Sequence, residues 1–320
     1  MALPPLLKDL RLPVIASPMF LVSSPALVIA QCKAGIVGAM PALNARPSAQ
    51  LDDWLAEITE TLAQHNAAHP GNPAAPFAIN QIVHKTNERW EADVKVCEKH
   101  RVPLIISSLG ARTELNDAVH AWGGLTFHDV VNNRFAHKAI EKGADGLIAV
   151  AAGAGGHAGS TSPFALVEEI RRWFPGPLAL SGAMATGRGV LAARAMGADL
   201  AYIGSAFIAT DEANAPAAYK QVIIDSSSED ILYSNYFTGV HGNYLKPTIR
   251  AAGLDPDNLP ARDAEGMKFS KEGGSSKPTA WRDIRGAGHG IGVIDAVVPV
   301  SALVDRLERE YRAARQALEA

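Results

Sequence analysis

Short apolar runs recur through the first two thirds of the chain, and most are separated by segments with helical spacing. The runs are almost continuously apolar rather than alternating, and they are bounded by Gly, Pro or Ser. This character is typical of parallel strands that are covered on both faces. Eight strands are therefore predicted, at Val14–Met19, Gly35–Met40, Phe77–Ile82, Pro103–Leu109, Gly124–Phe127, Gly146–Ala151, Pro177–Met184 and Leu200–Phe207.

The segments between these strands have amphipathic helical faces. Asn133–Lys142 places Phe135 on one face with other apolar residues, and Pro163–Phe174 begins with Pro and carries Phe164 on its apolar face. Repeated strand and helix units predict an α/β fold, either a closed (β/α)₈ barrel or a doubly wound sheet. Eight units with none left over favour the barrel, in which functional residues lie at the C-terminal ends of the strands.

The pattern changes after Val222. Residues 225–290 are rich in Ser, Gly, Asn and Pro and show weak periodicity, as in active-site covers and linkers. A final helix with an apolar face is predicted at Val300–Ala320. We therefore expect a cofactor-binding and catalytic barrel over residues 1–224 and an irregular lid over its mouth at 225–290. Residues 291–320 should supply a C-terminal helix that packs on the barrel.

Composition excludes several classes of protein. Of 320 residues, 48% are hydrophobic and 20% charged, which is too apolar for a disordered chain. A net charge of −3 disfavours nucleic acid or an acidic membrane as the main partner. The two cysteines form no CxxC pair, and no signal peptide or long apolar span is present, so a cytoplasmic enzyme is expected. The ten histidines show no HxH or HExxH spacing, so no metal site is predicted.

The densest cluster of unusual residues is Gly153–Gly159, directly after the sixth predicted strand. Glycines let the backbone approach a ligand closely, and His157 is the one side chain here that transfers protons near neutral pH. The alternative is that the glycines only turn the chain and His157 is a loop histidine. The position at the C-terminal end of a barrel strand favours the catalytic interpretation.

Glycine-containing turns also follow the seventh and eighth predicted strands, at Ser181–Gly189 and Gly204–Phe207. In barrels, these two loops often bind phosphate through backbone N–H groups. At the ends of the first and third strands, Met19 offers an exposed backbone turn, and Asn80 and Gln81 offer amide donors and acceptors for a planar heterocycle. The run Gly286–Gly292 follows no strand, so it is expected to be a loop.

Several segments, in order, resemble the nitronate monooxygenase family, whose members are flavin enzymes related to flavin-dependent enoyl-acyl-carrier-protein reductases. The resemblance rests on an AGGHxG element and a GADxxxxGxxFxAT element, with further matches along the chain. These matches are Pro13–Met19, Phe77–Asn80, Gly143–Gly159, Leu180–Thr186, Gly197–Thr210 and Gly286–Ile294. The resemblance implies a TIM barrel that holds FMN noncovalently at its C-terminal mouth.

The resemblance also implies roles for individual residues. The catalytic histidine of the family falls on His157, and its flavin-contacting asparagine on Asn80. The backbone of Met19 is expected near the flavin ring, and Val150 offers the flavin only its backbone. The remaining cofactor-binding positions are Gly155 and Gly156 of the AGGH loop, Ser181 and Gly182 after strand seven, and the phosphate turn Tyr202, Ile203, Gly204 and Ser205.

Three functions remain open. The leading hypothesis is a nitronate monooxygenase that oxidises small alkyl nitronates with O₂ to a carbonyl compound and nitrite. The second is an NAD(P)H-dependent flavin reductase of enoyl thioesters or quinones. It is motivated by Val150 and Gly153, which stand where many family members have Gln and Glu. The third is a carrier or sensor that binds flavin or a phosphorylated metabolite. The oligomeric state is not fixed by the sequence, and a homodimer is one option.

Overall fold

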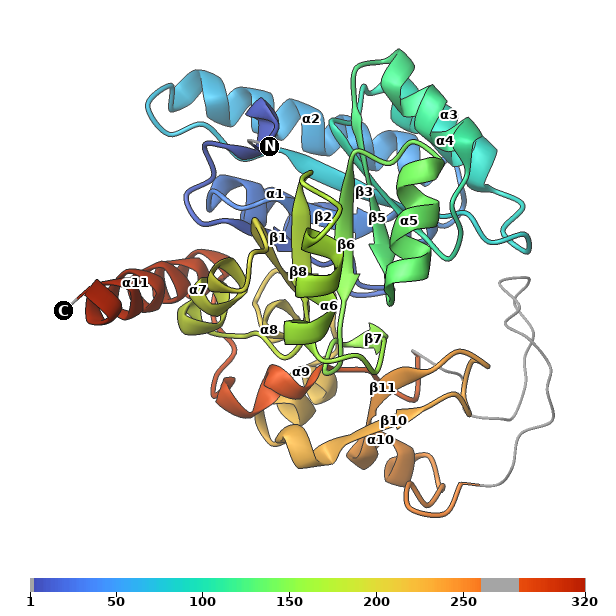
Figure 1. The fold of residues 1–320 in the computed structure, drawn as a ribbon, viewed down its shortest axis with the longest axis vertical. Helices are drawn as coiled ribbons and strands as arrows, with labels where there is room; N and C mark the ends of the chain where they lie inside the picture. Colours follow the sequence, from blue (N-terminus) through green and yellow to red (C-terminus); the bar gives the residue numbers. More distant parts are fainter. Residues whose placement is uncertain (1–2, 260–281, 320) are drawn as a thin grey trace.

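Eight parallel strands form a barrel surrounded by helices (Figure 1). The computed structural model describes residues 3–259 and 282–319. The sheet has the order β1-β9-β8-β6-β5-β4-β3-β2, and a parallel bridge between Ile15 and Val37 closes it. The predicted α/β barrel is therefore confirmed. Its strands are β1 (Val14–Ala16), β2 (Gly38–Pro41), β3 (Phe77–Ile82), β4 (Leu104–Ser108), β5 (Leu125–Val130), β6 (Gly146–Val150), β8 (Leu178–Ser181) and β9 (Leu200–Ile203).

Strand side chains alternate between the interior of the barrel and the surrounding helices. One buried cluster fills the barrel and includes Ile15, Ala78, Ile106, Phe127 and Ile148, each from a different strand. The residues between them pack outward in two other buried clusters. Because successive strand residues point to opposite faces, the residue two positions after each interior side chain also faces the interior, nearer the mouth.

The helices cover the barrel in sequence order (Figure 1). Phe135 is 40% exposed and Phe164 is 69% exposed, so the prediction that both face the core is wrong. Small side chains such as Ala136 and Ala139 face the core instead and let the helix lie close to the sheet. The helices are α1 (Pro25–Lys33), α2 (Gln50–Ala68), α3 (Trp90–Lys99), α4 (Thr113–Ala121), α5 (Asn133–Glu141), α6 (Pro163–Arg171), α7 (Gly187–Ala195), α8 (Ser205–Ile208) and α9 (Ala217–Ile224).

The described part of residues 225–290 is not wholly irregular, contrary to expectation. It contains an antiparallel pair, β10 (Ile231–Ser234) and β11 (Gly242–Leu245), followed by α10 (Lys246–Ala251). β11 also pairs antiparallel with β7 (Gly156–His157), so this small sheet includes the histidine singled out in the sequence. Weak periodicity hid these strands because they are only four residues long. The KEGGSSKP run lies outside the described residues.

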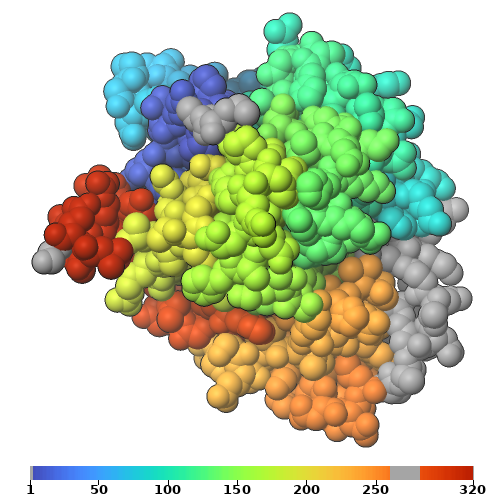
Figure 2. Space-filling view, in the orientation of Figure 1, coloured from blue at the N-terminus to red at the C-terminus, as the bar shows by residue number. Residues whose placement is uncertain are grey.

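The C-terminal helix α11 (Val300–Glu319) packs against α7 on the outside of the barrel (Figures 1 and 2). A Cβ on Gly187 would lie 2.0 Å from the carbonyl oxygen of Leu307, so only glycine allows this close approach. The Gly187 N–H donates to Glu310 at 2.7 Å. Within the described residues, no helix is long and apolar enough to span a bilayer.

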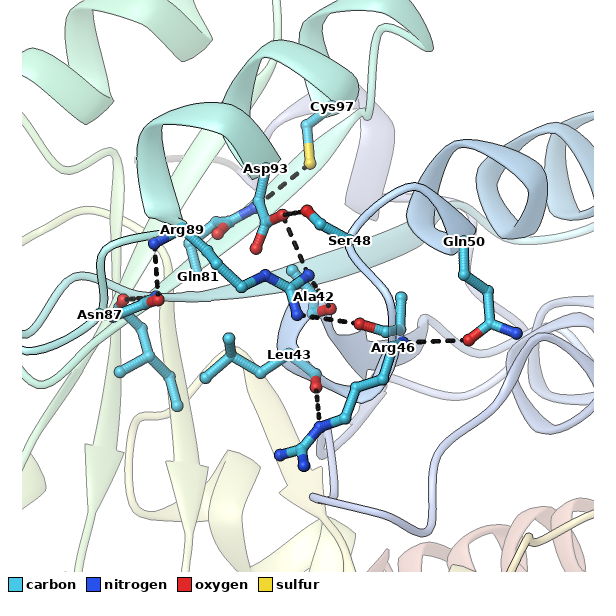
Figure 3. A network of polar contacts seen from close by, with 12 residues as sticks. Ala42, Leu43, Arg46, Ser48, Gln50, Gln81, Asn87, Arg89, Asp93 and Cys97 are labelled. Carbon is cyan, nitrogen blue, oxygen red and sulfur yellow. Dashed lines mark hydrogen bonds and ion pairs between the residues drawn. The ribbon is translucent and has the colours of Figure 1, made fainter. Parts of the chain in front are cut away.

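A buried polar network holds the loop after β2 against α3 (Figure 3). Arg89 donates to Asp93 at 3.1 Å and to the carbonyl of Ala45 at 2.9 Å. Ser48 donates to the same Asp93 oxygen at 3.0 Å. The Asp93 side chain is fully buried, and burial raises its pKa in spite of Arg89. Arg89 therefore compensates a carboxyl group that has no contact with water.

We expect Arg89→Ala to lower the free energy of unfolding by about 3 kcal/mol, because it leaves the buried Asp93 carboxyl without its cation. Urea denaturation would measure the change. Lys99→Ala is the matched control, since Lys99 pairs with Asp52 at the surface and its loss should change stability little. Equal effects of the two substitutions would contradict the role assigned to Arg89.

Candidate functional site

His157 lies on β7, between the loop that follows β6 and the strand β11. It pairs in register with Gly242, and its Nε2 is 3.0 Å from the Thr238 hydroxyl. Burial lowers the pKa of His157 to about 4. The imidazole is therefore neutral at pH 7, the form in which it accepts a proton.

Glycine turns from three parts of the chain meet beside this loop. The carbonyl of Gly153 accepts hydrogen bonds from the N–H groups of Ala183 at 3.1 Å and His289 at 2.9 Å. The Gly288 N–H donates to Ser205 Oγ at 2.9 Å. Together these turns enclose a small pocket, here called the glycine pocket. It is lined by Gly153, Ala154, Gly155, Ser181, Gly182, Ala183, Met184, Tyr202, Gly204, Ser205, Gly288 and Gly290.

The turns around the glycine pocket leave no room for side chains. A Cβ on Gly155 would lie 2.9 Å from the Gly288 nitrogen, and one on Gly288 would lie 2.6 Å from the Gly153 oxygen. A Cβ on Gly290 would lie 2.8 Å from the carbonyl carbon of Ala183. Gly153 also has a φ of +84°, which favours glycine. Glycine backbone therefore makes up much of the pocket wall, and Ser181, Tyr202 and Ser205 are the hydroxyl-bearing residues that line it.

Polar side chains form the layer of the barrel interior nearest the mouth, here called the polar layer. Asn80 Nδ2 donates to Ser108 Oγ at 2.7 Å, and Ser108 Oγ donates in turn to Asp129 Oδ2 at 2.6 Å. Burial raises the pKa of Asp129. Burial, and secondarily the nearby Asp129, raises the pKa of Tyr202. The layer consists of Ser17, Asn80, Ser108, Asp129, Ser181 and Tyr202.

Asp129 and Ser108 were missed by the sequence analysis, although strand alternation contains the signal. Phe127 fills the barrel, so the residue two positions later faces the mouth. The same alternation shows that the expectation for Gln81 is wrong, because Gln81 points outward and donates to Cys97 Sγ at 3.4 Å. His128 also lies outside the polar layer, with its ring bonded to the carbonyls of Gly110 and Asp129.

The structure brings most of the remaining predicted positions to the same end of the barrel. Gly204 lies against the turn after β1, and a Cβ added at Gly204 would lie 3.8 Å from Met19 Sδ. The Met19 carbonyl accepts from Asn44 at 3.0 Å, so its backbone is held within that turn. The carbonyl of Val150 accepts from Gly159 at 3.3 Å, and that of Ile203 from Ser17 at 2.8 Å. Gly156 lies on β7 next to His157.

Gly288 and Gly290 belong to a run expected to be only a loop. The structure places them against Gly153, Gly155 and Ala183, far away in the sequence. The run overlaps the 3-10 helix His289–Val293, and Gly288 and Gly290 line the glycine pocket. The alternate glycines of this run were a sequence signal for close backbone packing. Because the run follows no predicted strand, the sequence did not indicate which part of the barrel it would contact.

The sequence profile described as nitronate monooxygenase matches residues 5–310. The chain belongs to the nitronate monooxygenase family. The members of this family are oxidoreductases and flavoproteins. This agrees with the resemblance drawn from the AGGHxG and GADxxxxGxxFxAT elements.

Individual relatives are distant. The chain is 27% identical over 220 residues to the nitronate monooxygenase of Neurospora crassa, covering 63% of this chain and 58% of that protein. The match therefore spans less than two thirds of the relative's length. An octahydroindene carboxyl-CoA dehydrogenase of Rhodococcus jostii is 25% identical, over 74% of this chain and 63% of its own length. FabK from Thermotoga maritima has the same fold, with a TM-score of 0.77, 22% identity, and coverage of 98% of this chain and 96% of FabK.

Proposed function

We propose that this nitronate monooxygenase family member binds FMN noncovalently, with the phosphate in the glycine pocket. Backbone N–H groups and a hydroxyl bind phosphate without requiring a metal or many cations. The contacts among Gly153, Gly155, Gly288 and Ser205 support this assignment, because these turns bring backbone and one serine hydroxyl to the wall of the pocket. The residues present therefore fit the phosphate of a flavin mononucleotide.

The polar layer would lie beneath the flavin ring. Asn80, Ser108 and Tyr202 offer donors and acceptors at the mouth, which suit a heterocycle with N–H and C=O edges. Met19 lies beside Gly204, where the turns after β1 and β9 meet. When bound, FMN supplies electron transfer between the substrate carbon and O₂. The protein contributes binding, orientation and exclusion of water.

The reaction we propose is oxidation of small alkyl nitronates with O₂ to a carbonyl compound and nitrite. His157 carries this proposal, because it is a neutral, partly buried imidazole on the strand adjoining the glycine pocket. It would accept the α-carbon proton of a neutral nitroalkane that enters, which converts that compound to its nitronate beside the flavin site. The β10–β11 pair would shield this position from water.

A second candidate is NAD(P)H-dependent reduction of an enoyl thioester or quinone at the same flavin. Val150 and Gly153 favour it, because they lack the polar side chains that many family members place at these two positions. The name of the Rhodococcus relative also describes a CoA thioester dehydrogenase. Both candidates require bound FMN and His157, and they differ in the compound that reduces the flavin.

Anaerobic reduction of the purified protein separates these candidates. We expect a flavin absorbance spectrum that an alkyl nitronate bleaches without NADH or NADPH. Bleaching by NADH or NADPH alone would support the reductase instead. A flavin that stays oxidised with all three compounds would point to a carrier, and a protein that binds no FMN after reconstitution would overturn the cofactor assignment.

A further inference from the structure

The ring of His157 is held by the segment that joins β10 to β11. Thr238 Oγ1 lies 3.0 Å from His157 Nε2, and Thr238 is 7% exposed. The Thr238 hydroxyl also lies 3.0 Å from the carbonyl oxygen of Val240 and 3.3 Å from the Tyr244 hydroxyl. Tyr244 is fully buried. One buried hydroxyl thus connects the histidine, a backbone carbonyl and a tyrosine.

Counting protons assigns the direction of each hydrogen bond. The Val240 carbonyl can only accept, so the single proton of Thr238 Oγ1 is donated to it. The Val240 N–H donates to the same oxygen at 3.4 Å and occupies one of its two lone pairs. His157 Nε2 at 3.0 Å is closer to this oxygen than the Tyr244 hydroxyl at 3.3 Å, so the other lone pair accepts from His157, and Nε2 carries a proton. A neutral imidazole has one N–H, so Nδ1 of His157 carries the lone pair.

We propose that Thr238 is a positioning residue that fixes His157 as the Nε2–H tautomer, so that Nδ1 is the nitrogen that takes up a proton in the reaction. The assignment of His157 to the reaction rests on the proposed function, whereas the tautomer rests only on the hydrogen bonds around Thr238. The same contact fixes the ring orientation. The segment between β10 and β11 therefore selects which nitrogen of the histidine is basic.

The backbone around this contact keeps the two segments in register. Gly242 pairs with His157 and Asn243 with Gly156, while the Ala158 N–H donates to the His241 carbonyl at 3.3 Å. The Tyr233 hydroxyl donates to the Ala158 carbonyl at 2.9 Å. The Tyr233 hydroxyl thus anchors the residue after β7 through its backbone, which makes Tyr233→Phe a matched control for a purely structural effect.

Nitrogen NMR of ¹⁵N-histidine-labelled, FMN-reconstituted protein tests the proposal directly, with the His157 signal assigned by its loss in His157→Asn. We expect the Nε2–H tautomer in the wild type and in Thr238→Ser. In Thr238→Val, the isosteric side chain cannot accept the Nε2 proton, so we expect a tautomer mixture or a reoriented ring. A wild-type protein with the proton on Nδ1 would overturn the proposal, whatever the variants do.

The second readout is steady-state turnover, measured with whichever compound reduces the flavin in the anaerobic experiment: the alkyl nitronate, NADH or NADPH. Thr238→Val should lower kcat about tenfold to a hundredfold with little change in KM, because part of the acid–base contribution of His157 is lost. Thr238→Ser should keep most of the wild-type kcat, and Tyr233→Phe should leave kcat nearly unchanged. Equal losses in Thr238→Val and Tyr233→Phe would show a structural role only. The NMR readout needs no substrate, so a wrong nitronate assignment would leave the tautomer result intact.

Discussion

Gly288→Ala should weaken FMN binding about a hundredfold. The added Cβ would lie 2.6 Å from the Gly153 oxygen and 2.9 Å from the Gly155 nitrogen, and both are backbone atoms that cannot rotate away. Overpacking of this kind costs about 1–3 kcal/mol, and about 1.4 kcal/mol corresponds to a tenfold change in affinity. The strain falls on turns that line the glycine pocket, so it should appear in cofactor affinity. Titration of the apoprotein with FMN, followed by flavin fluorescence, gives the dissociation constant.

The control for this substitution lies four residues away on the same turn. A Cβ on Gly292 would meet its nearest neighbour, the Ser227 Cα, at 3.7 Å, which is ordinary van der Waals contact. Gly292→Ala should therefore bind FMN as the wild type does. Unchanged affinity in Gly288→Ala, with the protein folded, would show that the phosphate lies elsewhere. Equal weakening in both variants would point to a general disturbance of the 3-10 helix.

The barrel was predictable because its strands are buried on both faces and its helices have apolar stripes. Eight runs, from Val14–Met19 to Leu200–Phe207, led to the eight strands observed in the barrel, with differences only at their ends. The strands of residues 225–290 could not be found this way. β10 and β11 are short, and their pairing with β7 depends on tertiary contact rather than on periodicity. Local pattern does not contain that information.

The candidate site was predictable where it follows a strand. His157 lies in the loop after the sixth predicted strand, and Ser181, Gly182 and Gly204 lie near the C-terminal ends of the seventh and eighth. The topology of a barrel brings these strand ends together. Gly288 follows no strand, so its place beside Gly153 is a property of the folded chain. Thr238 was missed for a related reason. A threonine between short strands has no recognisable signature until its neighbours in space are known.

The glycine pocket and the small sheet meet at the loop after β6. Asn243 on β11 donates to the Ala154 carbonyl at 2.6 Å, and β7 begins two residues later. One short loop therefore connects the turn assigned to the phosphate with the histidine assigned to proton transfer. Substitutions at the two places should nevertheless have different effects. Those in the glycine pocket should weaken FMN binding, and those of His157 should lower turnover.

His157→Asn should lower kcat/KM by about a hundredfold to ten-thousandfold while FMN affinity stays close to that of the wild type. Asparagine keeps a polar side chain at this position, but it cannot take up a proton. Steady-state turnover, together with the FMN titration, measures both quantities. A variant that keeps turnover would remove His157 from the mechanism. A variant that loses FMN would instead make His157 part of the cofactor site.

The pH dependence of stability and turnover, compared between the wild type and His157→Asn, checks the protonation state of His157. The folded protein lowers the pKa of His157 from 6.5 to about 4, so the fold favours the neutral form. The stability that this preference contributes is present above pH 6.5 and is lost as the pH falls through about 4. Between pH 7.5 and 5, the wild type should lose up to about 2 kcal/mol of unfolding free energy that His157→Asn does not lose. Wild-type turnover should stay on its neutral-histidine plateau down to about pH 5, because one pH unit above the pKa most of the imidazole is still unprotonated. Parallel stability curves for the two proteins would mean that His157 reaches solvent and titrates as an ordinary surface histidine.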